Sequence, residues 1–238
     1  MKDQSVKHIY WFAYYNLDSP SVRYRAKYPL EYARKHLGIS HDLIMPGYRP
    51  RQILFFLRNY FKALFFLQQG EWIIIQRLSS GFLYSTLLRI LVRLRPSRTM
   101  YDLDDADYLK YPPRHLHFFA KHCRYVLAGS KKIKAYLSTY NQRIVFLTSP
   151  VYDLGKYKEQ KGSVFTIGWT GGFRWGHQAS LEKLVFPAIK TLPFPCRLLL
   201  VGVQRPQDQK YIRSYFADAP MVTVDIVQRI DWNDEPKL

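Results

Sequence analysis

Short apolar runs alternate with amphipathic stretches along the whole chain. The apolar runs are rich in β-branched and aromatic residues, which is typical of strands. The amphipathic stretches have apolar residues at three- and four-residue spacing, which is typical of helices. The predicted strands are residues 7–14, 42–46, 71–78, 98–103, 124–128, 143–147, 163–167, 197–201 and 222–227. The predicted helices are residues 21–37, 49–69, 82–94, 115–121, 131–140, 178–192 and 207–217.

This alternation of strands and helices predicts an α/β protein whose sheets are parallel and covered by helices on both faces. The run 71–78 is continuously apolar, as expected for a strand buried on both sides. A polar, lysine-rich stretch at 153–162 is the expected linker between an N-terminal domain, residues 1–152, and a C-terminal domain, residues 163–238. Ligands of such sheets bind at the carboxyl ends of the strands.

Two predicted helices have unusual sequences. Pro29 falls inside 21–37 and predicts a kink or a late helix start, because proline lacks the backbone N–H of a helix interior. The segment 49–69 is apolar on most of its circumference, with a narrow basic stripe that includes Arg58 and Lys62. It is either a buried helix with snorkelling basic ends or a helix lying on a membrane interface. No apolar run reaches the ~18 residues of a membrane span.

The positive charge is concentrated in the N-terminal part of the chain. The net charge is +18; residues 1–160 hold 26 Lys+Arg against 11 Asp+Glu, and residues 161–238 hold 10 against 7. This distribution favours a polyanion, an anionic membrane surface or an acidic substrate as partner. Zinc, RNP-type and helix-turn-helix signatures are missing from the sequence, which makes nucleic acid an unlikely partner.

The cysteines and the N-terminus bear on the compartment. Cys123 and Cys196 have no metal-type spacing, which predicts buried thiols in a reducing compartment. The first residues run directly into a predicted strand, so we expect no signal peptide. We therefore expect a cytoplasmic protein.

A glycine-rich stretch follows the strand 163–167. Gly168, Gly171 and Gly172 precede a predicted helix, and Arg174 lies between Gly172 and that helix. A strand, a glycine turn and a helix can bring backbone N–H groups close to an anion, since glycine has no Cβ to clash with a phosphate. The alternative is a tight turn without a ligand, because neither GxGxxG nor GxxxxGKS is present.

Four acids stand close together at the end of the strand 98–103. They are Asp102, Asp104, Asp105 and Asp107. Asp104 or Asp105 could orient or deprotonate an acceptor hydroxyl. Alternatively, a DxD pair, Asp102/Asp104 or Asp105/Asp107, could bind Mg²⁺ or Mn²⁺. The acids could also simply cap the next element. Repulsion among them calls for a basic partner, for which Arg23 and Arg25 are the candidates.

Several stretches together resemble glycosyltransferase family 4, whose members have the GT-B architecture of two Rossmann-like domains. The stretches are residues 19–25 (SPSVRYR), 101–106 (YDLDDA), 126–130 (VLAGS), 148–152 (TSPVY), 166–172 (TIGWTGG) and 198–202 (LLLVG). The resemblance implies transfer of a sugar from a nucleotide-diphosphate donor to an acceptor, with retained configuration. It also implies that no cofactor and no obligatory metal take part. The nucleotide sugar is then a co-substrate, and the acceptor is a lipid- or polysaccharide-linked sugar or lipid.

The resemblance also assigns roles to individual residues. Asp104 and Asp105 are the implied catalytic residues. Arg23, Tyr24 and Arg25 are the implied acceptor-binding residues. The implied nucleotide-sugar site consists of Gly171, Gly172, Arg174 and Gly202. Gly176 and His177 stand where the family has a lysine, and a later E-x7-E segment is missing, so the C-terminal domain is expected to be truncated.

Two further expectations follow. A truncated transferase could instead be a non-catalytic module that binds a nucleotide or a membrane. The basic N-terminal domain and the segment 49–69 also suggest peripheral docking on the inner leaflet of a membrane.

Overall fold

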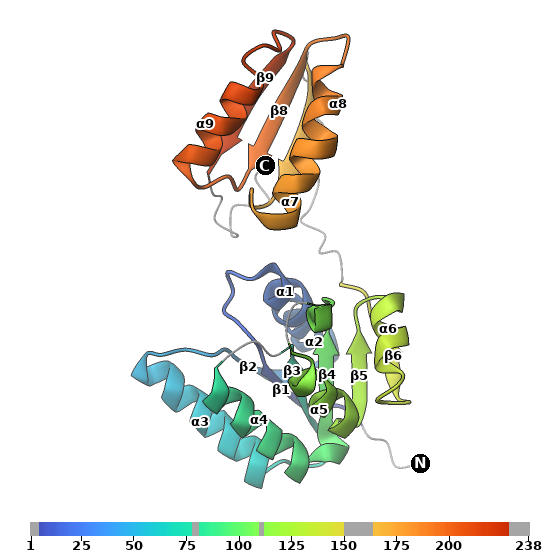
Figure 1. The fold of residues 1–238 in the computed structure, drawn as a ribbon. Helices are drawn as coiled ribbons and strands as arrows, with labels where there is room; N and C mark the ends of the chain where they lie inside the picture. Colours follow the sequence, from blue (N-terminus) through green and yellow to red (C-terminus); the bar gives the residue numbers. More distant parts are fainter. Residues whose placement is uncertain (1–4, 78–80, 110–111, 150–163, 229–238) are drawn as a thin grey trace. The chain divides into compact units, whose positions relative to one another are not determined.

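The computed structural model describes residues 5–77, 81–109, 112–149 and 164–228. The chain divides into two compact units, Met1–Asp153 (unit 1) and Leu154–Leu238 (unit 2) (Figure 1). The expected linker at 153–162 lies outside the described residues. Each unit is an α/β structure on a parallel sheet, and the predicted fold class is thereby confirmed.

Unit 1 is built on a six-stranded sheet in the order β2-β1-β3-β4-β5-β6, and every neighbouring pair is parallel. The strands are β1 (His8–Phe12), β2 (Ser40–Ile44), β3 (Glu71–Gln76), β4 (Thr99–Leu103), β5 (Tyr125–Ala128) and β6 (Ile144–Phe146). Each of the six overlaps a strand that the sequence predicts. The strand β3 is buried along most of its length, as its continuous apolar run predicts.

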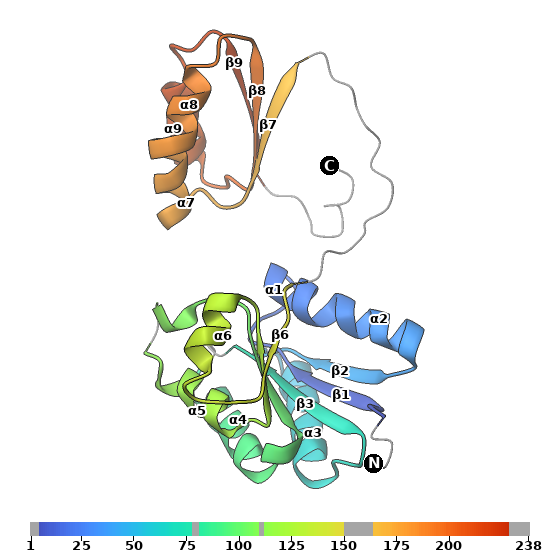
Figure 2. The same cartoon turned by 90° about the vertical axis from the view of Figure 1, so that its right-hand side faces the viewer.

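Helices cover both faces of this sheet (Figure 2). One face carries α1 (Pro20–Val22) and α2 (Tyr28–Leu37). The other face carries α3 (Pro50–Phe65), α4 (Phe82–Leu94), α5 (Arg114–His122) and α6 (Lys131–Leu137). Successive residues of β1 show the two faces: Phe12 packs with α3 and α4, whereas Trp11 packs with the α1–α2 side, because strand side chains alternate.

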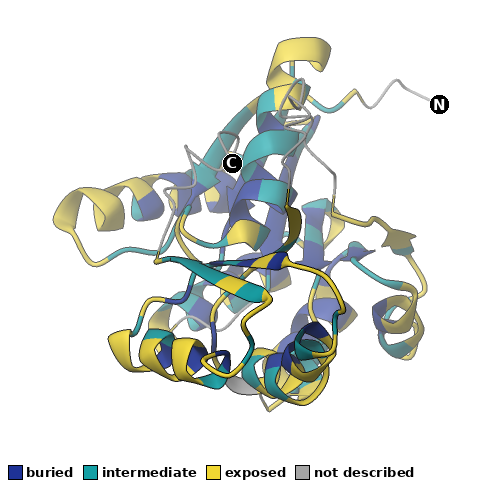
Figure 3. Cartoon of the chain, turned by 90° about the horizontal axis from the view of Figure 1, so that it is seen from above, coloured by how far each residue is buried: buried dark blue, intermediate teal, exposed yellow. Residues whose placement is uncertain are grey.

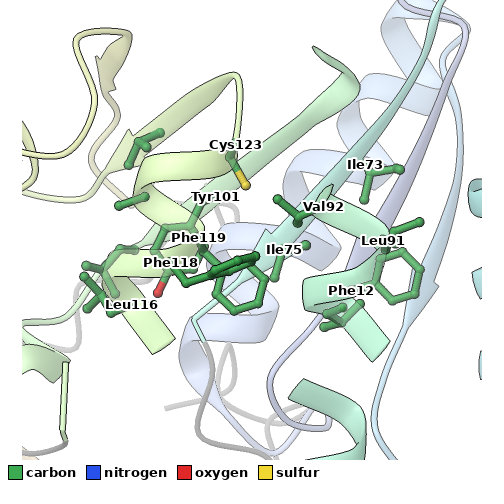
Figure 4. Packing of buried hydrophobic residues seen from close by; sticks show 14 of the residues in the cluster. Phe12, Ile73, Ile75, Leu91, Val92, Tyr101, Leu116, Phe118, Phe119 and Cys123 are labelled. Atoms are coloured by element: carbon green, nitrogen blue, oxygen red, sulfur yellow. The ribbon is translucent and has the colours of Figure 1, made fainter. Parts of the chain in front are cut away.

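The larger core lies between the sheet and α3 to α6. Figure 4 shows Phe12, Ile73 and Ile75 of the strands facing Leu91 and Val92 of α4. Tyr101 of β4 stacks on Phe119 of α5, with ring centroids 5.6 Å apart. Figure 3 shows the same distribution, with buried residues gathered in the strands and on the helix faces that meet them.

Unit 2 has a three-stranded parallel sheet in the order β7-β8-β9. Its elements are β7 (Phe165–Thr170), α7 (Trp175–Ser180), α8 (Phe186–Lys190), β8 (Cys196–Val201), α9 (Pro206–Tyr215) and β9 (Val222–Val227). Among the residues described in unit 2, helices cover only one face of the sheet (Figure 2). The expectation of helices on both faces therefore holds for unit 1 and not for the described part of unit 2.

Both cysteines are buried free thiols, as predicted. Burial raises the pKa of the Cys123 thiol to about 12.

Three local predictions need correction. Gly168 lies inside β7 and not in the turn after it, since β7 continues to Thr170. The helix at 49–69 ends at Phe65. Pro29 lies in the first turn of α2, as a late start would place it, but helical structure already begins with α1 and continues through a π-helical turn, Arg23–Lys27, after which the N–H of Tyr28 donates to the carbonyl of Arg23. The wider turn accommodates a residue that cannot donate to the fourth carbonyl before it.

Candidate functional site

The carboxyl ends of β1, β3 and β4 bring several polar side chains together in unit 1. Tyr14 follows β1, Arg77 comes directly after β3, and the acids begin near the end of β4. The three strands are neighbours in the sheet, so their ends meet at one edge. This edge is where parallel α/β sheets bind ligands.

Arg25 and Asp102 form a buried ion pair beneath this edge. The Nε of Arg25 lies 3.1 Å from each carboxylate oxygen of Asp102, and its Nη2 donates to Oδ1. The side chains are 1% and 0% exposed. Burial raises the pKa of Asp102 to about 6 against the opposing pull of Arg25. Arg25 is thus confirmed as the basic partner of one of the acids, Asp102. The ion pair lies in the protein interior next to the sheet edge.

The other residues of the predicted acceptor-binding set are also partly enclosed. Arg23 is buried, and its Nη1 donates to the carbonyls of Leu17 at 2.8 Å and Asp18 at 3.2 Å. Tyr24 is half-buried and meets the ring of Tyr28 edge-on. Acceptor binding by Arg23, Tyr24 and Arg25 stays a prediction.

Arg77 is the residue that the sequence analysis missed. Its Nε and Nη2 donate to Asp107 at 2.8 and 2.6 Å, and its Nη1 donates to Asp105 at 2.6 Å. Its guanidinium lies over the ring of Tyr14, 4.5 Å from the centroid. Burial alone would lower the pKa of Arg77, but the bonds to Asp107 and the nearby Tyr14 raise it.

The backbone of Arg77 is strained. Its φ of 46° lies in the left-handed region, which residues with a Cβ rarely occupy. Such strain persists only where the surroundings fix it, and it concentrates at functional sites. In Arg77 the backbone N–H donates to the carbonyl of Asp102 while the side chain holds two acids, so both ends of the residue are fixed.

Asp104 and Asp105 differ in their surroundings. The Asp104 side chain is 8% exposed, and its Oδ1 lies 3.7 Å from Nη1 of Arg77. This oxygen has no hydrogen-bond partner among the described residues. The Asp105 side chain is 62% exposed. Buried polar atoms usually have a hydrogen-bond partner, so Oδ1 of Asp104, which has only the ion pair with Arg77, is an exception in this loop.

Gly129 allows the loop of residues 104–107 (the acid loop) to lie close to the end of β5. A Cβ at this position would be 2.6 Å from the Cα of Asp104. Only a residue without a side chain lets the two strand ends, after β4 and β5, approach this closely.

Metal ligation was left open by the sequence. In the part of the chain that the structure describes, no group of three or more His, Cys, Asp or Glu side chains is arranged to hold a metal ion. Asp105 and Asp107, one of the two DxD pairs, already accept hydrogen bonds from Arg77. The expectation of a metal-independent reaction stays a prediction.

The glycines of unit 2 meet at the carboxyl ends of β7 and β8. The N–H of Gly171 donates to Val201 at 2.8 Å. Gly202 has a φ of 107°, and a Cβ there would lie 2.7 Å from the carbonyl oxygen of Gly171. Gly202 therefore has a structural reason to be glycine. A Cβ at Gly172 would meet nothing within 4 Å, so its surroundings are open to a ligand.

Polar side chains stand close to these glycines in the sequence. Arg174 is exposed and directly precedes α7. The ring of Trp169 meets His177 edge-on at 5.9 Å, and its buried Nε1 has no hydrogen-bond acceptor among the residues that can be described. Arg174, Gly171 and Gly172 thus lie in one loop, as predicted, and nucleotide binding there stays a prediction.

Solved structures show what this fold resembles. A glycosyltransferase from Rickettsia africae ESF-5 matches 97% of this chain and 70% of its own, with a TM-score of 0.59 and 13% identity. The apo form of the lipopolysaccharide outer core galactosyltransferase WaaB matches 95% of this chain and 70% of its own, with a TM-score of 0.52 and 12% identity. No protein-family model and no curated protein matches the sequence. The chain has the fold of these glycosyltransferases.

Proposed function

We propose that the chain acts as a glycosyltransferase of family 4 type, which moves a sugar from a nucleotide-diphosphate donor to an acceptor hydroxyl with retained configuration. The observation that carries this proposal is the enclosed carboxylate of Asp104, which is ion-paired with Arg77 but lacks a hydrogen-bond partner for Oδ1 among the described residues, at the sheet edge of a glycosyltransferase-like fold. Fold alone supports many activities, so the site has to supply the argument.

Each unit has a part in the proposed reaction. Unit 1 holds the acceptor, whose hydroxyl donates a hydrogen bond to Asp104. For the configuration to be retained in one step, the acceptor oxygen bonds to the anomeric carbon on the same face from which the diphosphate leaves, as the bond from that carbon to the diphosphate oxygen breaks. The electron pair leaves with the diphosphate, and the hydroxyl proton passes to Asp104. In unit 2, the backbone of Gly171 and Gly172 and the charge of Arg174 would stabilise the leaving diphosphate.

Release of nucleoside diphosphate tests this function. The purified chain is incubated with UDP- and GDP-sugars, with and without simple glycoside acceptors, alongside the Asp104→Asn variant. We expect acceptor-dependent release by the wild type and a loss of about a hundredfold in the variant. Release that does not depend on acceptor, or no release with any donor, would contradict the proposal.

A second candidate function is a non-catalytic module that binds a nucleotide. Gly176 and His177 stand where the resemblance leads us to expect a lysine, which leaves Arg174 as the basic residue of this loop. Binding of UDP or GDP with no turnover of any sugar donor would favour this candidate.

We also propose that the chain associates peripherally with a membrane through α3. One face of α3 is buried, whereas Leu54, Phe61 and Phe65 on the opposite face are 69%, 48% and 61% exposed. Arg58 is exposed on that same outer face, at helical spacing from Leu54 and Phe61. An apolar face with basic residues fits a helix at an anionic interface. No helix in the described parts of the chain is long and apolar enough to span a bilayer.

A further inference from the structure

A basic pocket opens at the edge of the unit 1 sheet that is opposite the candidate site. Its volume is about 400 Å³, which is the size of a small-molecule site. The residues that line it come from the segments that precede β4, β5 and β6, which are parallel neighbours, so their amino ends meet at one edge. The lining includes Ser97, Lys121, His122, Arg124, Asn141 and Arg143.

Hydrogen bonds fix the walls of this basic pocket. The side-chain nitrogen of Asn141 donates to the carbonyls of Ala120 and Cys123 at 2.8 and 2.9 Å, and its oxygen accepts from the N–H of Arg143 at 2.7 Å. The backbone N–H of Arg124 donates into β4. The three segments are therefore held together without a ligand, which lowers the ordering cost of binding one.

The charge of the pocket has one sign. Lys121, Arg124 and Arg143 are always positive, His122 is positive when protonated, and no Asp or Glu lines the pocket. Among the described residues, none of these three permanent cations forms an ion pair with a carboxylate. Such an uncompensated positive field attracts anions.

The helix dipole accounts for only part of this charge. Lys121 and His122 stand in the last turn of α5, where the dipole favours cations. Arg124 and Arg143 lie outside the helices, so the dipole gives no reason for them. A ligand that bears negative charge gives a reason for all four.

Arg124 keeps donors for such a ligand. Its guanidinium lies over the rings of Trp72 and Tyr125, 5.8 and 5.4 Å from their centroids. Its one side-chain hydrogen bond within the described part of the chain runs from Nη1 to the carbonyl of Ser97, at 3.3 Å. A guanidinium has five N–H donors, so most of them have no acceptor there. Paired guanidinium donors match the oxygens of a phosphate.

We propose that the basic pocket binds a small soluble molecule through a phosphate monoester or diphosphate group. A phosphate monoester carries about two negative charges at pH 7, which suits three converging cations better than a single carboxylate does. The inference does not rest on the proposed function. The pocket is in unit 1, at the edge opposite Asp104, and the proposed nucleotide loop with Arg174 belongs to unit 2.

Binding of simple phosphates tests the proposal without requiring turnover. Inorganic phosphate, pyrophosphate and glucose 6-phosphate are titrated by calorimetry into the full chain that carries Arg174→Gln, so that the proposed nucleotide loop contributes little. Glucose is the uncharged control. We expect one pyrophosphate per chain, weaker binding at high salt, and no binding of glucose.

Two variants, made in that chain, locate the binding. Lys121→Gln with Arg143→Gln removes two exposed cations and should leave folding intact. It should weaken pyrophosphate binding by about tenfold or more, because hydrogen bonds to charged groups are lost. Arg124→Gln, with circular dichroism as the folding check, should act in the same direction.

The matched control for the double variant is Lys131→Gln with Lys132→Gln. It makes the same charge change on exposed positions of α6 that do not line the pocket. It should change pyrophosphate affinity by less than about twofold, because exposed charges at a distance are screened.

Several results would overturn the inference. Equal losses in the pocket variants and in the control would mean general attraction of anions to a basic chain. Pyrophosphate binding that Arg174→Gln alone abolishes would belong to unit 2. Binding to phosphatidic acid vesicles but to no soluble phosphate would make the ligand a lipid headgroup, and displacement of pyrophosphate by a DNA duplex would make the edge a nucleic-acid surface. Pyrophosphate binding in the pocket of a chain that transfers no sugar would contradict the proposed function and leave this inference standing.

Discussion

Arg25 and Asp102 face each other in the interior of unit 1, and both oxygens of the carboxylate lie 3.1 Å from the same Nε. The two residues come from the helix after β1 and from β4, so their pairing fixes those elements relative to each other. Asp102 is one residue from the end of β4. Its position therefore determines where the acid loop begins.

The first prediction concerns pH and this pair. Because the pKa of Asp102 is raised to about 6, the folded state keeps a proton that the unfolded chain has already lost. The contribution of Asp102 to stability is then present at low pH and is lost as pH rises toward 6. Relative to Asp102→Asn, the wild type should therefore lose about 2 kcal/mol of unfolding free energy when the pH is raised from about 4.5 to about 7.5.

Urea unfolding of both proteins at the two pH values measures this shift. Asp105→Asn, which removes a carboxylate that is 62% exposed, serves as the control in the same loop. A shift of opposite sign would mean that the attraction of Arg25 outweighs burial and holds the pKa of Asp102 below its ordinary value.

The second prediction separates Asp104 from Asp105. Asp104→Asn should lower kcat about a hundredfold, because Asp104 is the proposed proton acceptor and its Oδ1 has no hydrogen-bond partner among the described residues. Asp105→Asn should change kcat by less than about fivefold, because Asp105 is exposed and bonded to Arg77. Steady-state kinetics with circular dichroism as the folding check decides the matter. Equal activities of the two variants would disprove the assignment, and loss of wild-type activity in EDTA would bring back the metal hypothesis.

The third prediction concerns the glycine loop of unit 2. Gly172→Val should weaken UDP or GDP binding about tenfold or more by blocking the approach of a phosphate, while folding survives in the open surroundings. Gly168→Val is the matched control, since Gly168 lies inside β7 and a Cβ there also meets nothing within 4 Å. Calorimetric titration of the three proteins is the measurement. Identical affinities would place the nucleotide elsewhere.

The fourth prediction concerns the outer face of α3. Sedimentation with liposomes should rise with phosphatidylserine content and fall with salt, because each basic residue near an anionic surface contributes roughly 1 kcal/mol. Arg58→Glu with Lys62→Glu should reduce binding strongly. Lys131→Glu with Lys132→Glu makes the same charge change on exposed positions of α6 and should reduce it less. No sedimentation at low salt would leave α3 as an ordinary half-buried helix.

Hydrophobic periodicity predicted the elements of this fold well. The bounds of α4 and β9 agree with the sequence prediction at both ends, because apolar spacing and flanking residues mark them. Gly168 was misplaced because a glycine often ends a strand, yet β7 is an edge strand of its sheet and tolerates it. The π-helical turn before Pro29 was not predicted, because such a turn does not appear in the sequence pattern.

The site was harder to predict than the fold. The need for a basic partner of the acids followed from charge, and Arg25 was found that way. Arg77 escaped because its role depends on a left-handed backbone and on the meeting of strand ends that are distant in sequence. Asp104 and Asp105 differ in burial. Two identical neighbouring residues look alike in the sequence, so this difference could not be predicted from it.

The hydrogen bond from Arg25 to the carbonyl of Leu147 spans 122 residues of sequence. During synthesis the chain emerges from its N-terminus, so Arg25 is made long before its acceptor. Contacts of this range close late in folding, because the ordering of the intervening chain has to come first. The helix after β1 consequently cannot complete its interior contacts until β6 has been translated. A stalled or shortened product that ends before residue 147 would hold this arginine without one of its native acceptors.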